Sequence, residues 1–139
     1  MGLISFTDHE ISSNLTDKLL LKTFLASIFA QEQVEFKSVS YVFCNDDYLL
    51  KLNQKYLNHD TFTDILTFNL SGTSLPLVSE IYISIDRVKE NAKKLSETYL
   101  TELYRVMIHG ILHLCGYQDH SNEEKAEMRD KEDLYLSKV

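Results

Sequence analysis

The sequence between residues 100 and 116 reads LTELYRVMIHGILHLCG. Apolar side chains occupy nearly every turn of this segment, and the glycine at its end is typical of a helix stop. We therefore predict a helix over residues 100–115 that is buried on most of its surface and lies at the centre of the fold. The polar side chains that a buried helix retains are its most informative ones.

Four polar residues of this segment share one face of the predicted helix: Glu102, Arg105, His109 and His113. Their spacings of three, four and four residues place them in one stripe. His109 and His113 lie one turn apart, so two imidazole nitrogens can reach one metal ion, as in helical His-x-x-x-His zinc sites. The pattern predicts one Zn²⁺ per chain. The alternative is a pair of hydrogen-bonded core histidines.

The residues after the helix supply two candidates for a third zinc ligand. Gly116 can adopt the left-handed conformation that ends a helix, which would turn residues 117–120 back toward the histidines. Asp119 or His120 then comes within reach, and both residue types bind zinc. Three protein ligands leave one position for a water whose pKa falls to about 7, and this zinc-bound water is the expected nucleophile.

A glycine follows the first histidine. Zinc peptidases of the His-Glu-x-x-His type have their general-base glutamate at the position of Gly110, so peptide hydrolysis by that mechanism is disfavoured. A glycine inside a helix costs about 1 kcal/mol relative to alanine. We therefore expect Gly110 to permit the close approach of a strand or of substrate backbone. Cys115, like Cys44, is expected to be a packed thiol.

The rest of the sequence alternates β-rich runs with helical patterns. Strands are predicted over residues 3–6, 34–44, 63–70 and 80–85, the last two as a hairpin with a loop over 71–76. Helices are predicted over residues 14–31, 46–57, 87–95 and 122–136. Asn45 and a Ser121–Glu124 capping box begin two of them. This order predicts an α+β fold, a small mixed four-stranded sheet with helices packed on it, in which the metal-bearing helix is central.

Composition limits the classes of protein that the chain can represent. Its 139 residues are 44% hydrophobic and 25% charged, which is typical of one globular domain. Two cysteines are too few for a disulfide framework, and we predict neither a secretion signal nor a membrane span, so a cytoplasmic location is expected. The net charge of -7 opposes non-specific binding of nucleic acid, so any such partner must be held locally.

Residues 109–120, HGILHLCGYQDH, closely resemble the signature of the YbeY family, H-G-x-L-H-L-x-G-Y-D-H. Residues 52–68 are similar to its L-N-x-x-Y-R-x-x-D-x-P-T-D-V-L-S-F segment, and residues 80–86 to its G-D-I-x-I-S strand. The resemblance implies a single YbeY-like metal-dependent hydrolase domain over residues 1–139, with a zincin-like fold around the central metal-bearing helix. It implies a zinc-dependent, single-strand-specific endoribonuclease of ribosome biogenesis, which matures the 3′ end of 16S rRNA and acts in ribosome quality control. The expected partners are single-stranded RNA, small-subunit rRNA and the ribosome or ribosomal proteins, with no membrane partner.

The chain departs from the family pattern at two positions that concern the site. Gln118 is inserted relative to the signature, so spacing favours Asp119 as the third ligand whereas residue type favours His120. Leu57 stands where the family has an arginine that is thought to support catalysis. His59 is the candidate catalytic residue that could supply positive charge there. We also predict substrate-binding residues: Arg87, Arg105 and Tyr117.

Two other functions compete with the nuclease. A non-catalytic ribosome-assembly factor would use zinc structurally, in a closed site with four ligands that include both Asp119 and His120. A metallopeptidase would need a general base from outside the helix, with Glu80 or Asp64 as candidates.

Overall fold

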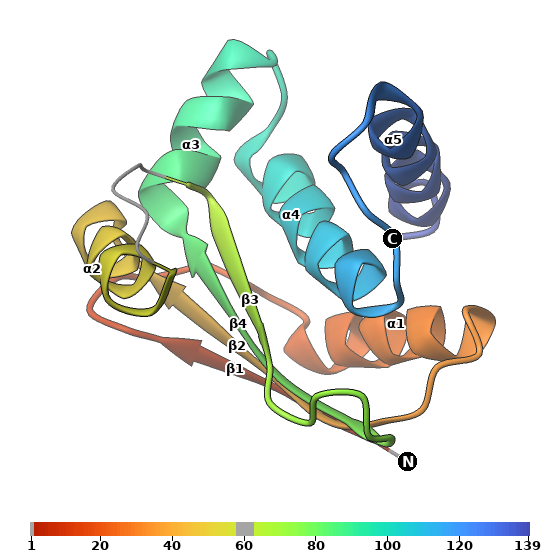
Figure 1. Ribbon diagram of the computed structural model, residues 1–139. Coiled ribbons are helices and arrows are strands. Elements are labelled where there is room, and N and C mark those ends of the chain that lie inside the picture. The colour runs from red at the N-terminus through yellow and green to blue at the C-terminus, as the bar shows by residue number, and fades with distance from the viewer. Residues whose placement is uncertain (1, 58–62) are drawn as a thin grey trace.

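The computed structural model describes residues 2–57 and 63–139 (Figure 1). Its strands are β1 (Leu3–Asp8), β2 (Phe36–Cys44), β3 (Ile65–Asn69) and β4 (Leu77–Ser84). Its helices are α1 (Lys18–Gln31), α2 (Asp46–Leu57), α3 (Ile85–Lys94), α4 (Tyr99–Leu114) and α5 (Asn122–Leu136). In the described part of the chain, no helix is long and apolar enough to cross a membrane.

The strands form one mixed sheet in the order β1-β2-β4-β3. Strands β1, β2 and β4 are parallel, and β3 pairs antiparallel with β4, with Thr67 opposite Ile81. The predicted hairpin and the predicted α+β fold with a mixed four-stranded sheet are therefore confirmed. The pairing of β2 shifts between Phe36 and Ser38, which explains why its apolar alternation slips once.

Several predicted boundaries were wrong by a few residues. The first helix begins at Lys18 rather than at residue 14, because Asn14 and Asp17 adopt positive φ angles of 56° and 49°, which helical residues do not. The strand predicted over 34–44 begins at residue 36, and the one predicted over 80–85 begins at residue 77. Helix α3 begins at residue 85, two residues earlier than predicted, because the Ser84 hydroxyl accepts from the Arg87 amide at 3.2 Å and caps it.

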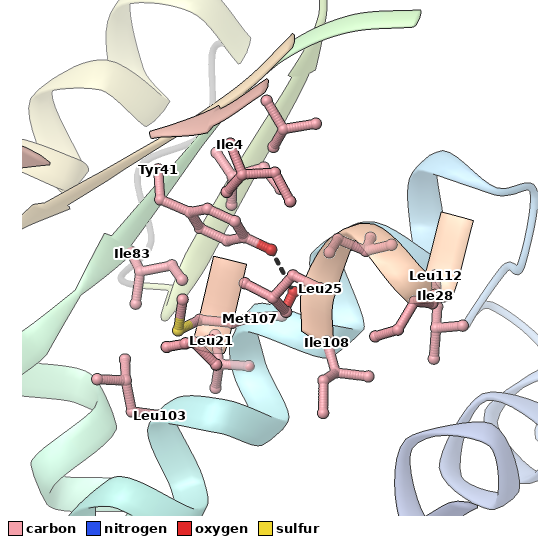
Figure 2. Close-up of a cluster of buried hydrophobic side chains, with 14 of the residues drawn as sticks. Ile4, Leu21, Leu25, Ile28, Tyr41, Ile83, Leu103, Met107, Ile108 and Leu112 are labelled. Carbon is pink, nitrogen blue, oxygen red and sulfur yellow. Dashed lines mark hydrogen bonds between the residues drawn. The ribbon is translucent and has the colours of Figure 1, made fainter. Parts of the chain in front are cut away.

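The main core lies between one face of the sheet and helices α1 and α4 (Figure 1). Strand side chains such as Tyr41 and Ile83 meet Leu25 of α1 and Leu103 of α4, and all are fully buried. The Tyr41 hydroxyl donates a hydrogen bond of 2.8 Å to the backbone carbonyl of Met107 (Figure 2). This contact fixes α4 to the central strand β2, and α4 is the buried central helix that the sequence predicts.

The second face of the sheet carries a smaller core under α2. Leu49 of this helix packs with Cys44 and Leu66. The helix begins where predicted, because the Asn45 side-chain oxygen accepts from the Tyr48 amide at 2.8 Å. Cys44 is buried and Cys115 half-buried, both are free, and burial raises the pKa of each thiol to about 12. Both cysteines are therefore packed thiols, as predicted.

Candidate active site

The polar face of α4 lines a cleft of about 470 Å³. All four side chains of the predicted stripe reach it: Glu102, Arg105, His109 and His113. Other segments add four further charged side chains to its lining: Asp64, Asp119, Arg129 and Glu132. The cleft therefore lies between α4, the segment around β3 and helix α5.

Gly110 lets α4 approach the sheet closely. A Cβ atom at this position would lie 3.0 Å from Cδ1 of Ile81 and 3.1 Å from Cδ1 of Ile65, tighter than side chains normally tolerate. The expectation that this glycine permits close approach of a strand is confirmed. The neighbouring His109 is thereby placed beside the β3 side of the cleft.

His109 is oriented by a carboxylate from α5. Its Nδ1 lies 2.6 Å from Oε2 of Glu132, and its Nε2 lies 3.6 Å from Oδ2 of Asp119. An ionised carboxylate can only accept, so the neutral imidazole donates from Nδ1 and keeps the lone pair on Nε2. Burial opposes the charged form, but the hydrogen bond and charge of Glu132 outweigh it, and the pKa of His109 is raised. In the neutral form, Nε2 keeps its electron pair and lies on the Asp119 side of the ring.

Sequence reasoning missed Glu132. The carboxylate is buried, and Arg105 reaches it at 3.4 Å while donating to Asp133 at 2.8 Å. A signal for it was present in the sequence, because Met128, Glu132 and Tyr135 lie four and three residues apart and form the buried face of a helix whose other residues are mostly charged. A carboxylate in the apolar stripe of such a helix indicates a buried cationic partner.

The turn after α4 separates the two candidate third ligands. Gly116 has a positive φ of 106°, as predicted for the helix stop. Asp119 lines the cleft, whereas His120 is exposed and is not among the residues that line it. Tyr117 points elsewhere, since its hydroxyl donates to Glu32 at the end of α1 at 2.7 Å. The geometry therefore brings Asp119, not His120 or Tyr117, to the histidines.

Two carboxyl groups of the cleft wall are removed from solvent, Glu102 fully and Asp64 in part. Burial raises the pKa of Asp64, against the opposing effect of the charge on His109. Burial and the neighbouring charge of Asp64 raise the pKa of Glu102, whose Oε1 has no hydrogen-bond partner among the described residues. The ionised forms of these two carboxyl groups are therefore poorly stabilised in the cleft.

The remaining predicted residues lie elsewhere. Arg87 is on α3 and pairs with Asp46 at 2.9 Å and with Glu90 at 3.0 Å, outside the cleft lining. Glu80 is on β4 and accepts from the Tyr82 hydroxyl at 3.2 Å. His59 lies outside the described residues. The roles predicted for Arg87 and His59 stay predictions.

The cleft offers donors of the kind that zinc binds, but they are not tightly gathered. No three histidine, cysteine, aspartate or glutamate side chains of the described residues converge closely enough to hold a metal ion as they stand. Two imidazoles one turn apart and one carboxylate nevertheless face the same space, and Glu132 supports one imidazole from behind. This donor set fits zinc, because ligating histidines usually donate their second N–H to a carboxylate.

An α+β fold whose central helix presents imidazole and carboxylate groups to a polar cleft defines an enzyme of acid–base or metal-assisted chemistry. The family model for Endoribonuclease YbeY matches residues 4–139, and the chain belongs to this family. The resemblance read from the sequence is therefore confirmed. So is the prediction of an enzyme, since its relatives are named as endoribonucleases.

Relatives cover nearly the whole chain. It is 42% identical over 134 residues to Endoribonuclease YbeY of Cytophaga hutchinsonii, covering 96% of this chain and 94% of that protein. It is 43% identical over 135 residues to Endoribonuclease YbeY of Flavobacterium psychrophilum, with the same coverage, 96% and 94%. The solution structure of TM1509 from Thermotoga maritima superposes with a TM-score of 0.66 at 32% identity, covering 97% of this chain and 87% of that one.

Proposed function

We propose that this protein is a zinc-dependent, single-strand-specific endoribonuclease. The observation that carries the proposal is the pairing of His109 with Glu132, which leaves Nε2 directed into the cleft beside Asp119. His113 lines the same cleft one turn further along α4. Membership of the endoribonuclease family supports RNA as the substrate.

His109, His113 and Asp119 are the residues that would hold the metal, one ion per chain. When bound, zinc supplies a Lewis acid that activates water for attack and polarises a phosphoryl oxygen. Glu132 keeps the proton of His109 on Nδ1, so that Nε2 remains available as a donor. Arg105 holds Glu132 in place by an ion pair in which both side chains are largely buried.

The charge of the cleft supports a requirement for a cation. Asp64, Glu102, Asp119 and Glu132 face two arginines, of which Arg105 is already bound to acidic side chains. A phosphodiester entering this cleft would meet a net negative field, which costs free energy at a few ångströms even with partial screening. A divalent ion reverses that balance, so we expect no cleavage of RNA without it.

Charge and family membership support the cellular role that we propose. The net charge of -7 favours a substrate that is presented to the cleft rather than captured from bulk RNA. The ribosome and its small-subunit RNA are such a substrate, and we propose that the protein acts in the cytoplasm on the 3′ end of 16S rRNA and in ribosome quality control. Single strands suit the cleft because their backbone can bend into it.

The alternatives have less support. Structural zinc would need both Asp119 and His120, yet His120 is exposed and outside the cleft lining. A metallopeptidase could draw on Asp64, which lines the cleft, but Gly110 occupies the position of the usual general base.

The test combines metal analysis with an RNA cleavage assay. Purified protein should carry about one equivalent of zinc and should cut a labelled single-stranded oligonucleotide internally. The same strand annealed to its complement should stay intact. Chelation should abolish cleavage, and added zinc should restore it. Cleavage that persists in chelator, or protein that carries zinc but never cuts RNA, would contradict the proposal.

A further inference from the structure

The cleft contains two guanidinium groups in different situations. Arg105 is 13% exposed and bound to two acidic side chains of α5, Glu132 and Asp133, so its charge is already neutralised within the protein. Arg129 also lines the cleft, but it is exposed and makes no ion pair with another described residue. Only the second of these cations is available to a ligand.

Arg129 is directed toward the cleft by its place on α5. It lies three residues before Glu132, so the two side chains share one face of the helix. Its positive charge acts on the buried carboxyl of Glu102, lowering the pKa that burial and Asp64 raise. Oε1 of Glu102 has no hydrogen-bond partner among the described residues, so it accepts none from Arg129. Arg129 therefore lines the cleft with no ion pair or hydrogen bond to another described residue, which leaves its N–H donors available to a ligand.

We propose that Arg129 binds a backbone phosphate of the RNA substrate, an inference that rests on the proposed function. A guanidinium presents paired N–H donors that match two phosphate oxygens, which an ammonium group cannot do. The surrounding carboxylates of Asp64, Glu102 and Asp119 repel phosphate, so a cation at the edge of the cleft decides where the chain of phosphates enters. Arg129 positions the strand beside the histidines and takes no part in bond breaking.

The experiment compares Arg129→Gln and Arg129→Lys with the matched control Lys125→Gln. Lys125 is exposed on α5 one turn before Arg129 and does not line the cleft, so its variant loses the same charge elsewhere on the helix. Initial rates are measured on one single-stranded oligonucleotide over a range of substrate and salt concentrations. Zinc content and the melting temperature are measured for every variant.

Arg129→Gln should raise KM about tenfold, while kcat and zinc content change little, because phosphate binding is lost and the chemistry is not. The slope of log kcat/KM against log salt should fall by about 0.7, the value for one phosphate contact with a single strand. The KM of Arg129→Lys should lie between those of Arg129→Gln and wild type. The KM of Lys125→Gln should stay within about twofold of the wild-type value.

Two outcomes would overturn the inference. One is a KM and salt slope for Arg129→Gln equal to those of Lys125→Gln. The other is a fall in kcat or zinc content with KM unchanged, which would make Arg129 a support of the site rather than a substrate contact. A wild-type protein that leaves the oligonucleotide intact contradicts the proposed function itself, and the wild-type rate is therefore measured first.

Discussion

Helices α4 and α5 lie side by side (Figure 1). Both line the same cleft, yet α4 is mostly apolar in sequence and α5 mostly charged. Helix α4 buries eight of its residues, mostly apolar, and is joined to the sheet by the Tyr41–Met107 hydrogen bond. Helix α5 buries only three residues, one of which is Glu132. The difference indicates a division of labour. The core helix carries two of the candidate ligands, and the surface helix supplies the carboxylate that orients His109 and the arginine proposed to bind the substrate.

This arrangement has a physical reason. A metal ligand must keep its place within a fraction of an ångström, and a helix packed on both sides by apolar side chains provides that rigidity. Groups that tune charge or bind phosphate tolerate a helix held by fewer contacts. Substitutions of the ligands on α4 should therefore abolish zinc binding, whereas substitutions on α5 should only lower zinc or substrate affinity.

The largest effect is expected on α4. His109→Ala or His113→Ala should lower zinc affinity by at least about 100-fold and abolish RNA cleavage, since the loss of an outer-shell partner alone costs roughly 10- to 100-fold. Zinc content after dialysis against a competing chelator measures the effect. Unchanged circular dichroism would show that the helix persists. Retention of a full equivalent of zinc by either variant would remove that histidine from the site.

The next effect concerns the turn between the two helices. Asp119→Ala should lower zinc affinity strongly, whereas His120→Ala should change it by less than about threefold, because only Asp119 lines the cleft and approaches His109. The two variants serve as controls for each other in one chelator titration. The reverse order of affinities would transfer the third-ligand role to His120.

On α5 a smaller effect is expected. Glu132→Gln should lower zinc affinity about 10-fold, because an amide no longer fixes the proton of His109 on Nδ1 by charge. Asp133→Asn is the matched control, since Asp133 is exposed and binds Arg105 without touching His109. If both variants bind zinc equally well, the His109–Glu132 contact is structural and the tuning role of α5 would be wrong.

The contrast between α4 and α5 also explains which features of the fold and of the site could be predicted from the sequence. Local periodicity and spacing were enough to predict the polar stripe on α4 and its glycine stop. They also predicted the strands of the sheet and the N-terminal caps of α2 and α5, and the structure confirms these features. Glu132 and Arg129 did not emerge, because their meaning depends on contact with residues 23 or more positions away. Leu19 shows the limit of periodicity, since it has apolar helical spacing with its neighbours in α1 but is 79% exposed. Periodicity identifies a helix, and only packing decides which side chains it buries.

The anchor of α4 gives a stability effect of intermediate size. Tyr41→Phe removes a buried hydroxyl and leaves the Met107 carbonyl without this donor, which should lower the free energy of unfolding by about 1 kcal/mol. Urea denaturation measures the change at constant slope. Tyr56→Phe is the control, because Tyr56 is 58% exposed. Equal stability of Tyr41→Phe and wild type would mean that the hydrogen bond adds nothing to the docking of α4.

The smallest effect is a change in pH dependence at the start of α4. The pKa of Glu102 in the folded protein is raised above its ordinary value of 4.5 by burial and by Asp64, against the attraction of Arg105 and Arg129. A raised carboxyl pKa means that the folded state binds the proton more tightly than the unfolded chain does. Its contribution to stability is therefore complete below pH 4.5 and is lost as the pH rises through the folded pKa.

Replacing the Glu102 carboxyl by a neutral amide should remove the loss of stability that this group causes as the pH rises. Glu102→Gln should unfold at a higher temperature than wild type at pH 8 and should lose its advantage at pH 5, where the wild-type carboxyl is closer to protonated. The measurement is a series of thermal melts of chelator-treated protein across this range, because a bound cation would alter the field of the cleft. Glu127→Gln, an exposed position on α5, controls for the loss of one negative charge. The outcome that contradicts this prediction is a pair of parallel curves of melting temperature against pH for Glu102→Gln and wild type. The Glu102 carboxyl would then be well solvated, and its ionisation would not destabilise helix α4.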